Sequence, residues 1–557
     1  MTTAVRAPIG FELAEYRNSD EEPDSSLRDN PMALVFPAPV AQEELYDLLA
    51  LDPPTRDANF KEQPLNVREE ALHRLDECYT PFPQDGEILS AVVSLVRKSF
   101  RYRHPRLPQV MYFIMRVAAG AHGALPRMQP TGGGGALGLL ISGPSGTGKS
   151  SLIDRIVVHI GAYARYHVSL LGKPCAWPQL GVIRISVANT WKETLVEFSK
   201  EIDRQYGRDV LFTRERHATE PRLQQVVWTA LCSGFAPCVI LDEFQRLGAL
   251  KPAVARKILE KLLDLMQSGG IPVIVVGTVA VRNLFEAFPM EMGKFSSGNE
   301  FKFQRLVEDD PNTINYITLL KEQSISMAPI EFSENFDRYL VLHSMGVRRV
   351  IRDFMRWVLN RHAVAETRGH VILADEALLM SIAENEMLVW QKALSAMRKF
   401  DLGFGQSFVQ IQAYEHFFPY EPEKKQTNAQ KYTEAMWIAE ARVSPEEDFR
   451  IISVEDFIFL RSQVELRQYE ECAERAQHLE RLGQREGHEK DAEAEDRRNV
   501  DQDLSPAKKA KTSKTGAKKA AKPKEPADPR SNVVPLSSVR KPPPESHLGV
   551  DPGNLPD

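Results

Sequence analysis

The chain has 557 residues, more than one compact core usually holds, so we expect at least two domains. Hydrophobic residues make up 43% and charged residues 26%, an ordinary globular mixture. No stretch approaches the roughly 20 apolar residues of a membrane-spanning helix, and no signal-peptide pattern opens the chain. We therefore expect no membrane partner and a location in a bacterial-type cytoplasm or nucleoid. The five cysteines lack metal-ligand spacing, and a disulfide framework is not expected.

The net charge of −6 conceals two regions of opposite sign. Residues 504–557 contain 11 Lys or Arg against 5 Asp or Glu, whereas residues 1–503 contain 59 against 71. Residues 488–557 contain no aromatic residue and are rich in Lys, Ala and Pro, which predicts a disordered basic tail. The acidic remainder by itself argues against a strongly basic nucleic-acid binder.

The N-terminal part of the chain divides into an irregular arm and a helical region. Residues 1–60 are rich in Pro, Asp and Glu and predict an irregular arm with one short helix near 42–51. Residues 61–130 predict a helical region, because apolar residues recur at helical spacing over 88–117. We expect this region to contact partners. A Pro- and Gly-rich break at 126–135 ends this region.

Residues 131–308 predict an α/β core, because short apolar runs alternate with helical segments, as in a parallel sheet covered on both faces. The predicted strands are 137–141, 182–187, 239–241, 272–278 and 301–306, and the predicted helices are 150–164, 190–206, 223–233 and 253–268. Residues 309–402 predict a helical lid. Residues 403–487 predict a further helical extension with a long charged helix at 455–486.

A glycine-rich loop lies between the first strand and the first helix of this core. It reads Gly143-Pro144-Ser145-Gly146-Thr147-Gly148-Lys149-Ser150, with Ser151 following, and matches the pattern GxxxxGK[ST]. Its backbone N–H groups and the helix N-terminus suit phosphate. Lys149 is expected to contact the β- and γ-phosphates, and Ser150 to bind Mg²⁺. The loop thus predicts a site for ATP and Mg²⁺ formed by residues 143–151.

Polar residues at later strand and helix ends extend this site. Asp242 and Glu243 end an apolar strand, where Asp242 can hold Mg²⁺ and Glu243 can polarise the attacking water as the catalytic base. Thr278 follows the next strand and fits either a γ-phosphate sensor or a cap of the next helix. Arg348 and Arg349 open a lid helix; we expect Arg348 to reach the nucleotide and one of the two to lie on a solvated face.

These motifs together resemble those of AAA+ ATPases and, more narrowly, of the TnsC/TniB-type regulators of transposition. The resemblance rests on the phosphate loop, on Leu-Asp-Glu-Phe-Gln-Arg-Leu at 241–247 and on Val-Val-Gly-Thr-Val-Ala at 275–280. The stretch Phe-Arg-Tyr-Arg-His-Pro at 100–105 and the length of the chain are closer to the longer TnsC type. The resemblance covers roughly residues 85–400 and implies a P-loop AAA+ core with a helical lid.

The resemblance also implies a function and partners. Such proteins bind ATP, assemble into rings or filaments on duplex DNA without reading its sequence, and disassemble on hydrolysis. They connect a TniQ/TnsD-type target selector to a TnsB-type transposase and, in some systems, to a TnsA-type endonuclease. A trans-acting arginine finger is expected near the end of the fourth core helix, where Arg305 and Lys294 are the candidates.

Two segments are candidates for DNA contact. The helix after the second core strand lines the pore in this fold class, so Thr190 and Lys192 are predicted contacts by analogy. The same residues also fit an N-capped amphipathic helix without a ligand. The tail carries eight lysines between Lys508 and Lys524, which suit either contact with the DNA backbone or a linker to the transposase and endonuclease.

Two other functions share the nucleotide motifs. A replication initiator or helicase loader would need a winged-helix domain after the lid, which residues 403–487 do not predict. A signalling NTPase would use the same nucleotide site and bind no duplex DNA.

Overall fold

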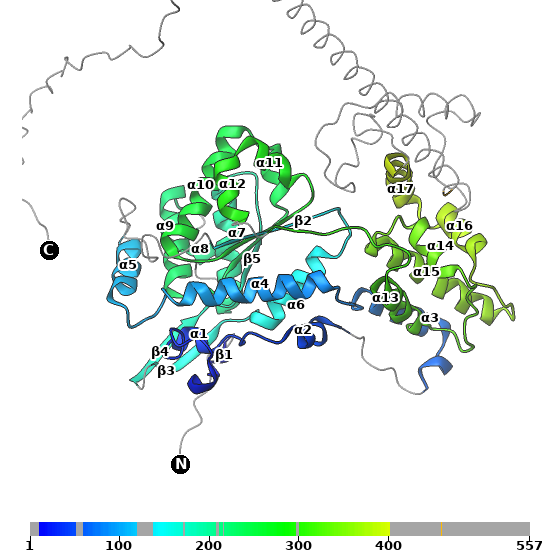
Figure 1. The fold of residues 1–557 in the computed structure, drawn as a ribbon, viewed down its shortest axis with the longest axis horizontal. Coiled ribbons are helices and arrows are strands. Elements are labelled where there is room, and N and C mark those ends of the chain that lie inside the picture. The colour runs from blue at the N-terminus through cyan, green and yellow to red at the C-terminus, as the bar shows by residue number, and fades with distance from the viewer. Residues whose placement is uncertain are drawn as a thin grey trace, which may run out of the picture. The chain divides into compact units, whose positions relative to one another are not determined.

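The computed structural model describes residues 11–51, 59–119, 137–170, 173–207, 211–215, 217–296 and 300–401, together with Ile458. These residues form an α/β core and a helical lid (Figure 1). Apart from Ile458, the predicted extension at 403–487 and the predicted disordered tail at 488–557 lie outside the described residues.

Within the described part of the chain, the core is built on five parallel strands in the order β5-β6-β7-β2-β8. Their bounds are Gly138–Ser142 for β2, Ile183–Ser186 for β5, Val239–Asp242 for β6, Val273–Gly277 for β7 and Glu300–Lys302 for β8. β2 and β7 are buried along their whole length, as expected of strands covered on both faces. The predicted parallel sheet and P-loop AAA+ fold are confirmed.

Helices cover both faces of this sheet (Figure 1). On one face lie α4 (Pro83–Phe100) and α6 (Lys149–Ile160). The other carries α7 (Trp191–Tyr206), α9 (Glu220–Ser233), α10 (Pro252–Gly269), α11 (Val281–Ala287) and α12 (Pro289–Ser296). This partition follows from right-handed crossovers, because the chain passes over one face from β2 to the edge strand β5 and returns over the other face. The short α8 (Leu211–Glu215) and α5 (Pro108–Ala118) pack against α9.

A second, smaller sheet was not predicted. β3 (Arg165–Leu170) and β4 (Lys173–Gln179) form an antiparallel hairpin, and β1 (Glu12–Leu13) pairs with β3 in parallel. The sequence signal is weak because β4 contains Pro174 and Pro178, which cannot donate to a ladder and which count against a strand in a sequence pattern.

The predicted N-terminal arm is mostly irregular, yet its described residues are packed rather than loose. It contains α1 (Pro31–Leu34), α2 (Gln42–Leu49) and a 3-10 turn at Ser19–Glu21. Leu27 and Met32 are fully buried in the same cluster as the core sheet. Burial of these side chains holds a segment that has little regular structure of its own.

The stretch at residues 100–105 anchors this arm. The Arg103 side chain is fully buried, packs against the rings of Phe100 and Phe235, and donates from Nη1 to the carbonyl of Ala236 at 2.8 Å. Burial lowers the pKa of Arg103 to about 10. The Asn30 side chain donates to the carbonyls of Phe100 and Arg103 at 2.8 and 3.2 Å. Buried contacts of residues 100–105 therefore join the arm to the core.

The predicted helical region at 61–130 is divided between two hydrophobic clusters. The buried stripes of α4 and α5 belong to the core cluster. α3 (Leu65–Glu70) and the 3-10 segment Ala71–Asp76 lie against the lid, where Leu72 and Leu75 join the lid cluster. Neither part has enough apolar surface to form a core alone, so each completes a neighbouring one.

The predicted helical lid is confirmed. It comprises α13 (Pro311–Glu322), α14 (Phe336–His343), α15 (Arg348–Thr367), α16 (Glu376–Asn385) and α17 (Leu388–Asp401). The connection from the core explains why β8 is shorter than predicted. The Phe303 N–H still donates to the Ser142 carbonyl of β2 at 2.8 Å, but the Leu306 N–H donates to the Gly346 carbonyl at 2.7 Å, so the backbone has left the sheet by Leu306.

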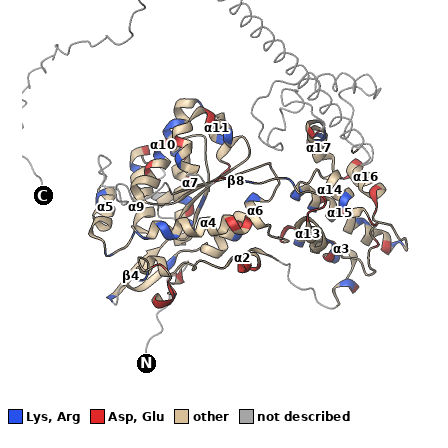
Figure 2. Ribbon diagram, viewed as in Figure 1, with Lys and Arg blue, Asp and Glu red and all other residues tan. Residues whose placement is uncertain are grey.

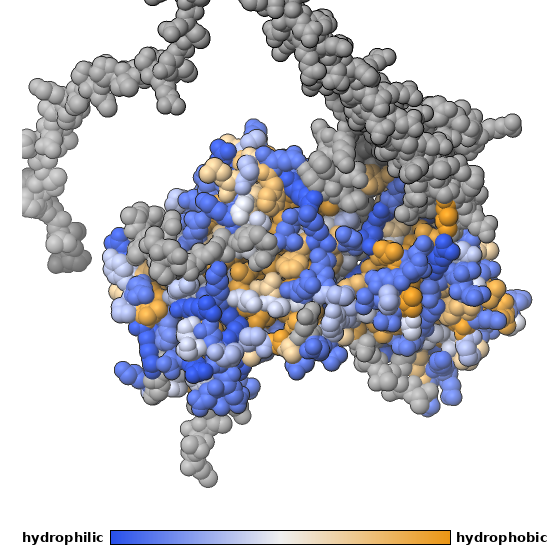
Figure 3. All heavy atoms as spheres, viewed as in Figure 1, coloured by the Kyte–Doolittle hydropathy of each residue, from blue (hydrophilic) through white to orange (hydrophobic). Residues whose placement is uncertain are grey.

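Basic and acidic residues both occur along the ribbons of the core and of the lid (Figure 2), and on the face drawn in Figure 3 hydrophobic residues lie among hydrophilic ones. No helix in the described ranges is both long and apolar enough to cross a membrane. Cys78, Cys175, Cys232 and Cys238 form no disulfide bond within the described part of the chain.

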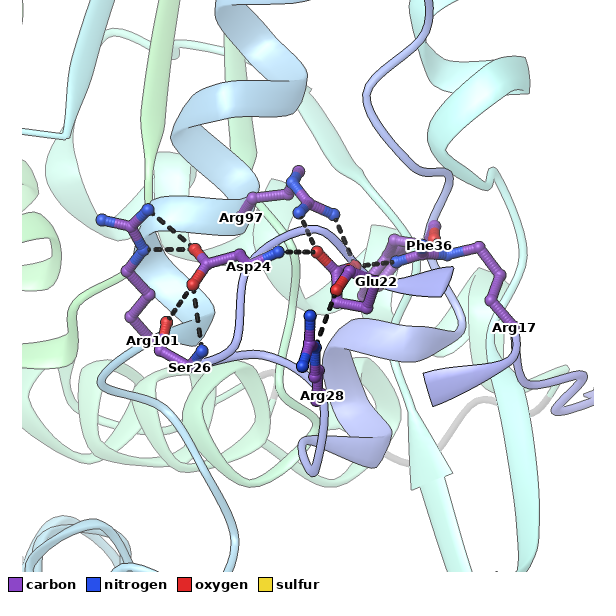
Figure 4. Close-up of polar contacts among 8 residues, drawn as sticks. All are labelled: Arg17, Glu22, Asp24, Ser26, Arg28, Phe36, Arg97 and Arg101. Atoms are coloured by element: carbon purple, nitrogen blue, oxygen red, sulfur yellow. Dashed lines mark hydrogen bonds and ion pairs between the residues drawn. The ribbon is translucent and has the colours of Figure 1, made fainter. Parts of the chain in front are cut away.

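A buried carboxylate joins the arm to α4 (Figure 4). Glu22 is fully buried and receives the guanidinium groups of Arg17 and Arg97, and the Asp24 N–H also donates to it. Asp24 in turn pairs with Arg101 at 2.7 Å. Burial alone would raise the pKa of Glu22, but these hydrogen bonds outweigh it and lower the pKa from 4.5 to about 2. The ionised form of Glu22 therefore stabilises the packed arm.

We predict that Glu22→Gln lowers the free energy of unfolding by about 3 kcal/mol at pH 7, because the depressed folded-state pKa corresponds to that amount. The contribution is complete above the unfolded pKa of 4.5 and is lost as the pH falls toward the folded pKa of about 2. Urea unfolding at pH 7 and pH 3 measures this contribution. The difference in unfolding free energy between wild type and the variant should roughly halve at pH 3. The exposed Glu15→Gln is the matched control; equal losses for both variants would contradict the assignment.

Candidate functional site

The carboxyl ends of β2, β6 and β7 meet the start of α15 at a cleft of about 310 Å³. Ligands of open parallel sheets bind at this edge, and the volume suits a small ligand. The lining residues from the core are Ser145, Gly146, Gly148, Lys149, Ser150, Ser151, Asp242, Glu243, Gly277 and Thr278. The lid contributes Tyr316, Arg348, Arg349 and Arg352, and the segment before α4 contributes Asp76, Cys78 and Tyr79.

The phosphate loop has the backbone of an anion-binding nest. Gly143, Gly146 and Gly148 have φ values of +156°, +78° and +102°, conformations that residues with a side chain rarely adopt. A Cβ on Gly143 would lie 2.6 Å from the Cβ of Phe303, so that glycine also allows close packing. α6 begins at Lys149, directly after Gly148. The N–H groups of the loop and of the first helical turn are thus available to phosphate oxygens.

Lys149 is buried at the base of this loop. Its Nζ donates to the carbonyls of Gly143 and Pro144 at 2.9 and 2.6 Å. Burial lowers the pKa of Lys149 to about 8, although the charges of Asp242 and Glu243 oppose the shift. A partly desolvated ammonium group held beside the nest fits a polyphosphate, whose charge would stabilise its protonated form.

The Asp242 carboxylate is held by two groups. Oδ1 accepts from the N–H of Glu243 at 2.9 Å, and Oδ2 accepts from Nη2 of Arg184 on the neighbouring strand β5 at 2.7 Å. Arg184 also pairs with Asp154 on α6. Asp242 and Ser150 line the same cleft and supply the oxygen atoms that Mg²⁺ takes as ligands, directly or through water. Bound with a nucleotide, that ion would neutralise phosphate charge.

Glu243 has a strained backbone. Its φ of 55° and ψ of 35° place it in the left-handed region, which residues with a side chain usually avoid. Such strain is found where the surrounding structure fixes a functional side chain. The carboxylate lines the cleft and accepts from Nε2 of Gln245 at 2.7 Å.

The lid meets the phosphate loop through Gly346, Val347 and Arg349. Gly346 has a φ of +67°, and a Cβ there would lie 2.1 Å from the carbonyl oxygen of Leu306. Val347 fills the space beside Gly146, where an added Cβ would be 2.7 Å from its Cγ1. The Arg349 N–H donates to the Gly146 carbonyl at 3.1 Å, while its side chain is exposed. The Arg349 side chain also lines the cleft, and its Cζ lies 5.7 Å from the ring centroid of Trp390, so a solvated face for one of the two arginines stays a prediction.

Arg348 is buried beside the loop. Its guanidinium lies 4.0 Å from the ring centroid of Phe82, and Nη2 lies 3.8 Å from Oδ2 of Asp85. A Cβ on Gly148 would be 3.0 Å from its Nη1. Nε of Arg348 is buried without a hydrogen-bond partner among the described residues. An incompletely paired cation at this position suits a phosphate-bearing ligand.

Asp85 is the part of this arrangement that sequence reasoning missed. It is buried and accepts from the Tyr79 hydroxyl at 2.8 Å and from the Phe82 N–H at 2.9 Å. Burial raises the pKa of Asp85, although Arg348 opposes the shift. Its position three residues after Phe82 is a capping signal for α4, but nothing in the sequence joins it to a lid arginine 263 residues later.

Thr278 lies at the end of β7 and lines the cleft with 9% of its surface exposed. α11 begins at Val281 with Ala280 as its N-cap, so Thr278 is not the N-cap residue. Its backbone N–H donates to Oε1 of Gln245 at 3.0 Å. The role of Thr278 as a sensor of the γ-phosphate stays a prediction, and its position in the cleft lining allows that role.

The candidates for contacts with a neighbour or with DNA lie away from the cleft lining. Arg305 pairs with Asp401 of the same chain at 2.5 Å, and Lys294 lies exposed on α12. Thr190 is the N-cap of α7, and its side chain accepts from the Glu193 N–H at 3.2 Å. Lys192 is exposed in the first turn of that helix. These residues stay predictions as finger and DNA contacts.

Residues 134–285 match the family model described as "AAA domain", which spans the core from just before β2 into α11. The chain thus carries a P-loop AAA domain, with the helical lid beyond the matched segment. A search of the curated proteins finds no match.

Similar solved structures include the ORC2 protein of Aeropyrum pernix in ADPNP–ADP complexes, at 16% identity and a TM-score of 0.31, covering 64% of this chain and 91% of that one. The Aeropyrum pernix ORC1 protein in complex with DNA is 13% identical, with a TM-score of 0.31 and coverage of 65% and 82%. Cdc6p from Pyrobaculum aerophilum is 13% identical, with a TM-score of 0.30 and coverage of 67% and 97%. Likeness at this level identifies no function.

We predict that MgATP binding is accompanied by proton uptake near pH 8, because Lys149 has a pKa of about 8 before phosphate approaches and phosphate raises it. Calorimetric titrations in buffers of different ionisation enthalpy should give roughly half a proton per nucleotide at pH 8 and clearly less at pH 7. An equal proton count at both pH values would contradict the assigned Lys149 environment.

Proposed function

We propose that the protein is an AAA+ ATPase that regulates DNA transposition, assembles on duplex DNA in its ATP-bound state and disassembles on hydrolysis. The observation that carries the ATPase part is the cleft, where the phosphate loop, Asp242, Glu243 and Arg348 converge from the core and the lid. The transposition part is supported by the sequence resemblance at residues 143–150, 241–247 and 275–280.

The groups of the cleft have complementary roles in hydrolysis. Glu243 accepts a proton from water while the water oxygen attacks the γ-phosphorus of ATP. The bond between that phosphorus and the β–γ bridging oxygen breaks, giving ADP and inorganic phosphate. Lys149 and Arg348 stabilise negative charge on the phosphates, and Asp242 and Ser150 would hold Mg²⁺, which would neutralise part of that charge.

The lid connects this site to assembly. Val347 and Arg349 contact Gly146 directly, so a phosphate bound in the loop influences the lid through a short path. A neighbouring subunit that touches the lid would then respond to the nucleotide state. Arg305 and Lys294 remain the proposed contributors to the neighbour's site, and Thr190 and Lys192 remain the proposed DNA contacts.

We predict that Glu243→Gln keeps ATP bound, lowers kcat for hydrolysis at least about a hundredfold and prolongs assemblies on duplex DNA, because the base is lost and the cleft kept. Lys149→Ala should lose nucleotide binding and assembly together. ATP turnover and electrophoretic mobility shifts, with and without a nonhydrolysable ATP analogue, measure both. Normal hydrolysis by the Glu243 variant would overturn its role, and no ATP-stimulated DNA binding by the wild type would favour a signalling NTPase.

The proposed partners are a TniQ/TnsD-type selector, a TnsB-type transposase and a TnsA-type endonuclease, with the basic tail as the docking arm for the last two. Deletion of residues 504–557 is expected to preserve ATP-dependent DNA binding and to abolish capture of the purified transposase. Loss of DNA binding in this deletion variant would contradict the assignment of the tail to transposase docking.

A further inference from the structure

One side chain at the edge of the cleft has not been given a role in the proposed hydrolysis. Gln245 lies in the 3-10 segment Phe244–Ala249 that follows β6. Its Nε2 donates to Oε2 of Glu243 at 2.7 Å, and its Oε1 accepts from the backbone N–H of Thr278 at 3.0 Å. One amide group therefore joins the proposed catalytic base to the end of the neighbouring strand β7.

The two contacts require a side chain that is donor and acceptor at once. In its ionised form the Glu243 carboxylate can accept hydrogen bonds but cannot donate them. The backbone N–H of Thr278 can donate a hydrogen bond but cannot accept one. A glutamine satisfies both with a single orientation of its amide, so the orientation follows from the partners. A glutamate would keep the bond to Thr278 and lose the donor to Glu243. A methionine would keep the length and lose both.

The surrounding backbone leaves room for this amide. Gly277 precedes Thr278, and a Cβ on Gly277 would lie 2.8 Å from Oε1 of Gln245 and 2.3 Å from Cγ2 of Val281. A residue with a side chain at this strand end would displace the amide. Glu243 has a left-handed backbone, and its carboxylate accepts from Nε2 of Gln245.

We propose that Gln245 is a positioning residue for ATP hydrolysis, which holds the Glu243 carboxylate in its water-activating orientation and ties that orientation to the end of β7. The inference rests on the proposed ATPase function. Gln245 acts through Glu243 and not on the phosphates, so its loss slows the chemical step and leaves nucleotide binding intact.

The electrostatic surroundings of Glu243 make the role measurable. Lys149 from α6 faces Glu243 across the cleft, Asp242 precedes it on β6, and Arg348 from the lid lines the same cleft. A second carboxylate at position 245 would lie at hydrogen-bond distance from Glu243. Two carboxylates at that distance repel each other, so Gln245→Glu removes the donor that holds Glu243 and adds a charge that displaces it.

The test is steady-state ATP hydrolysis by the full chain, with ATP affinity measured separately by calorimetry. Gln245→Met and Gln245→Glu are each expected to lower kcat about tenfold to a hundredfold with ATP affinity within about threefold of wild type. Gln109→Glu, the same change at an exposed position in α5, should match wild type.

The outcomes separate this inference from the function on which it rests. Hydrolysis by the wild type with kcat unchanged or increased in both Gln245 variants would overturn the positioning role alone. Loss of ATP affinity in both variants would show that Gln245 supports the cleft as a whole, and would also overturn it. No hydrolysis by the wild type would overturn the ATPase proposal and this inference together.

Discussion

The Arg349 N–H donates to the carbonyl of Gly146, and Val347 occupies the space that a side chain on that glycine would fill. This short contact is one connection between two hydrophobic clusters, one around the sheet and one in the lid. It places buried Arg348 against the phosphate loop, and it requires Gly346 to turn sharply against the Leu306 backbone. The cleft exists because the lid is fastened to the loop at this place.

The N-terminal part of the chain connects the same two clusters a second time. Its arm and α4 are packed on the core, while α3 and the 3-10 segment Ala71–Asp76 are packed on the lid. The chain crosses from one to the other at Tyr79, which lines the cleft and donates to Asp85. Asp85 then faces Arg348 at 3.8 Å. A partner that displaces this segment would change the surroundings of the nucleotide site without touching the phosphates.

Much of the nucleotide site could be predicted from local sequence. The glycine loop, Lys149, and the acids after β6 lie next to the strands that place them, and parallel strands bring their carboxyl ends to one edge. Parallel strands buried on both faces read as apolar runs, which is why their positions were predicted well. The β3–β4 hairpin was missed because its prolines remove the usual strand signal.

The sequence alone determined which groups are available for the proposed ATP chemistry, because the glycine loop, the acid pair and the strand ends each have a local pattern. Only the tertiary structure decided how these groups are held. Arg184 reaches Asp242 from another strand, Asp85 meets Arg348 from the far side of the loop, and Gln245 joins Glu243 to Thr278. Such contacts join residues distant in sequence or belonging to different elements. They depend on the packing of side chains, which cannot be predicted from the periodicity of residues along the chain.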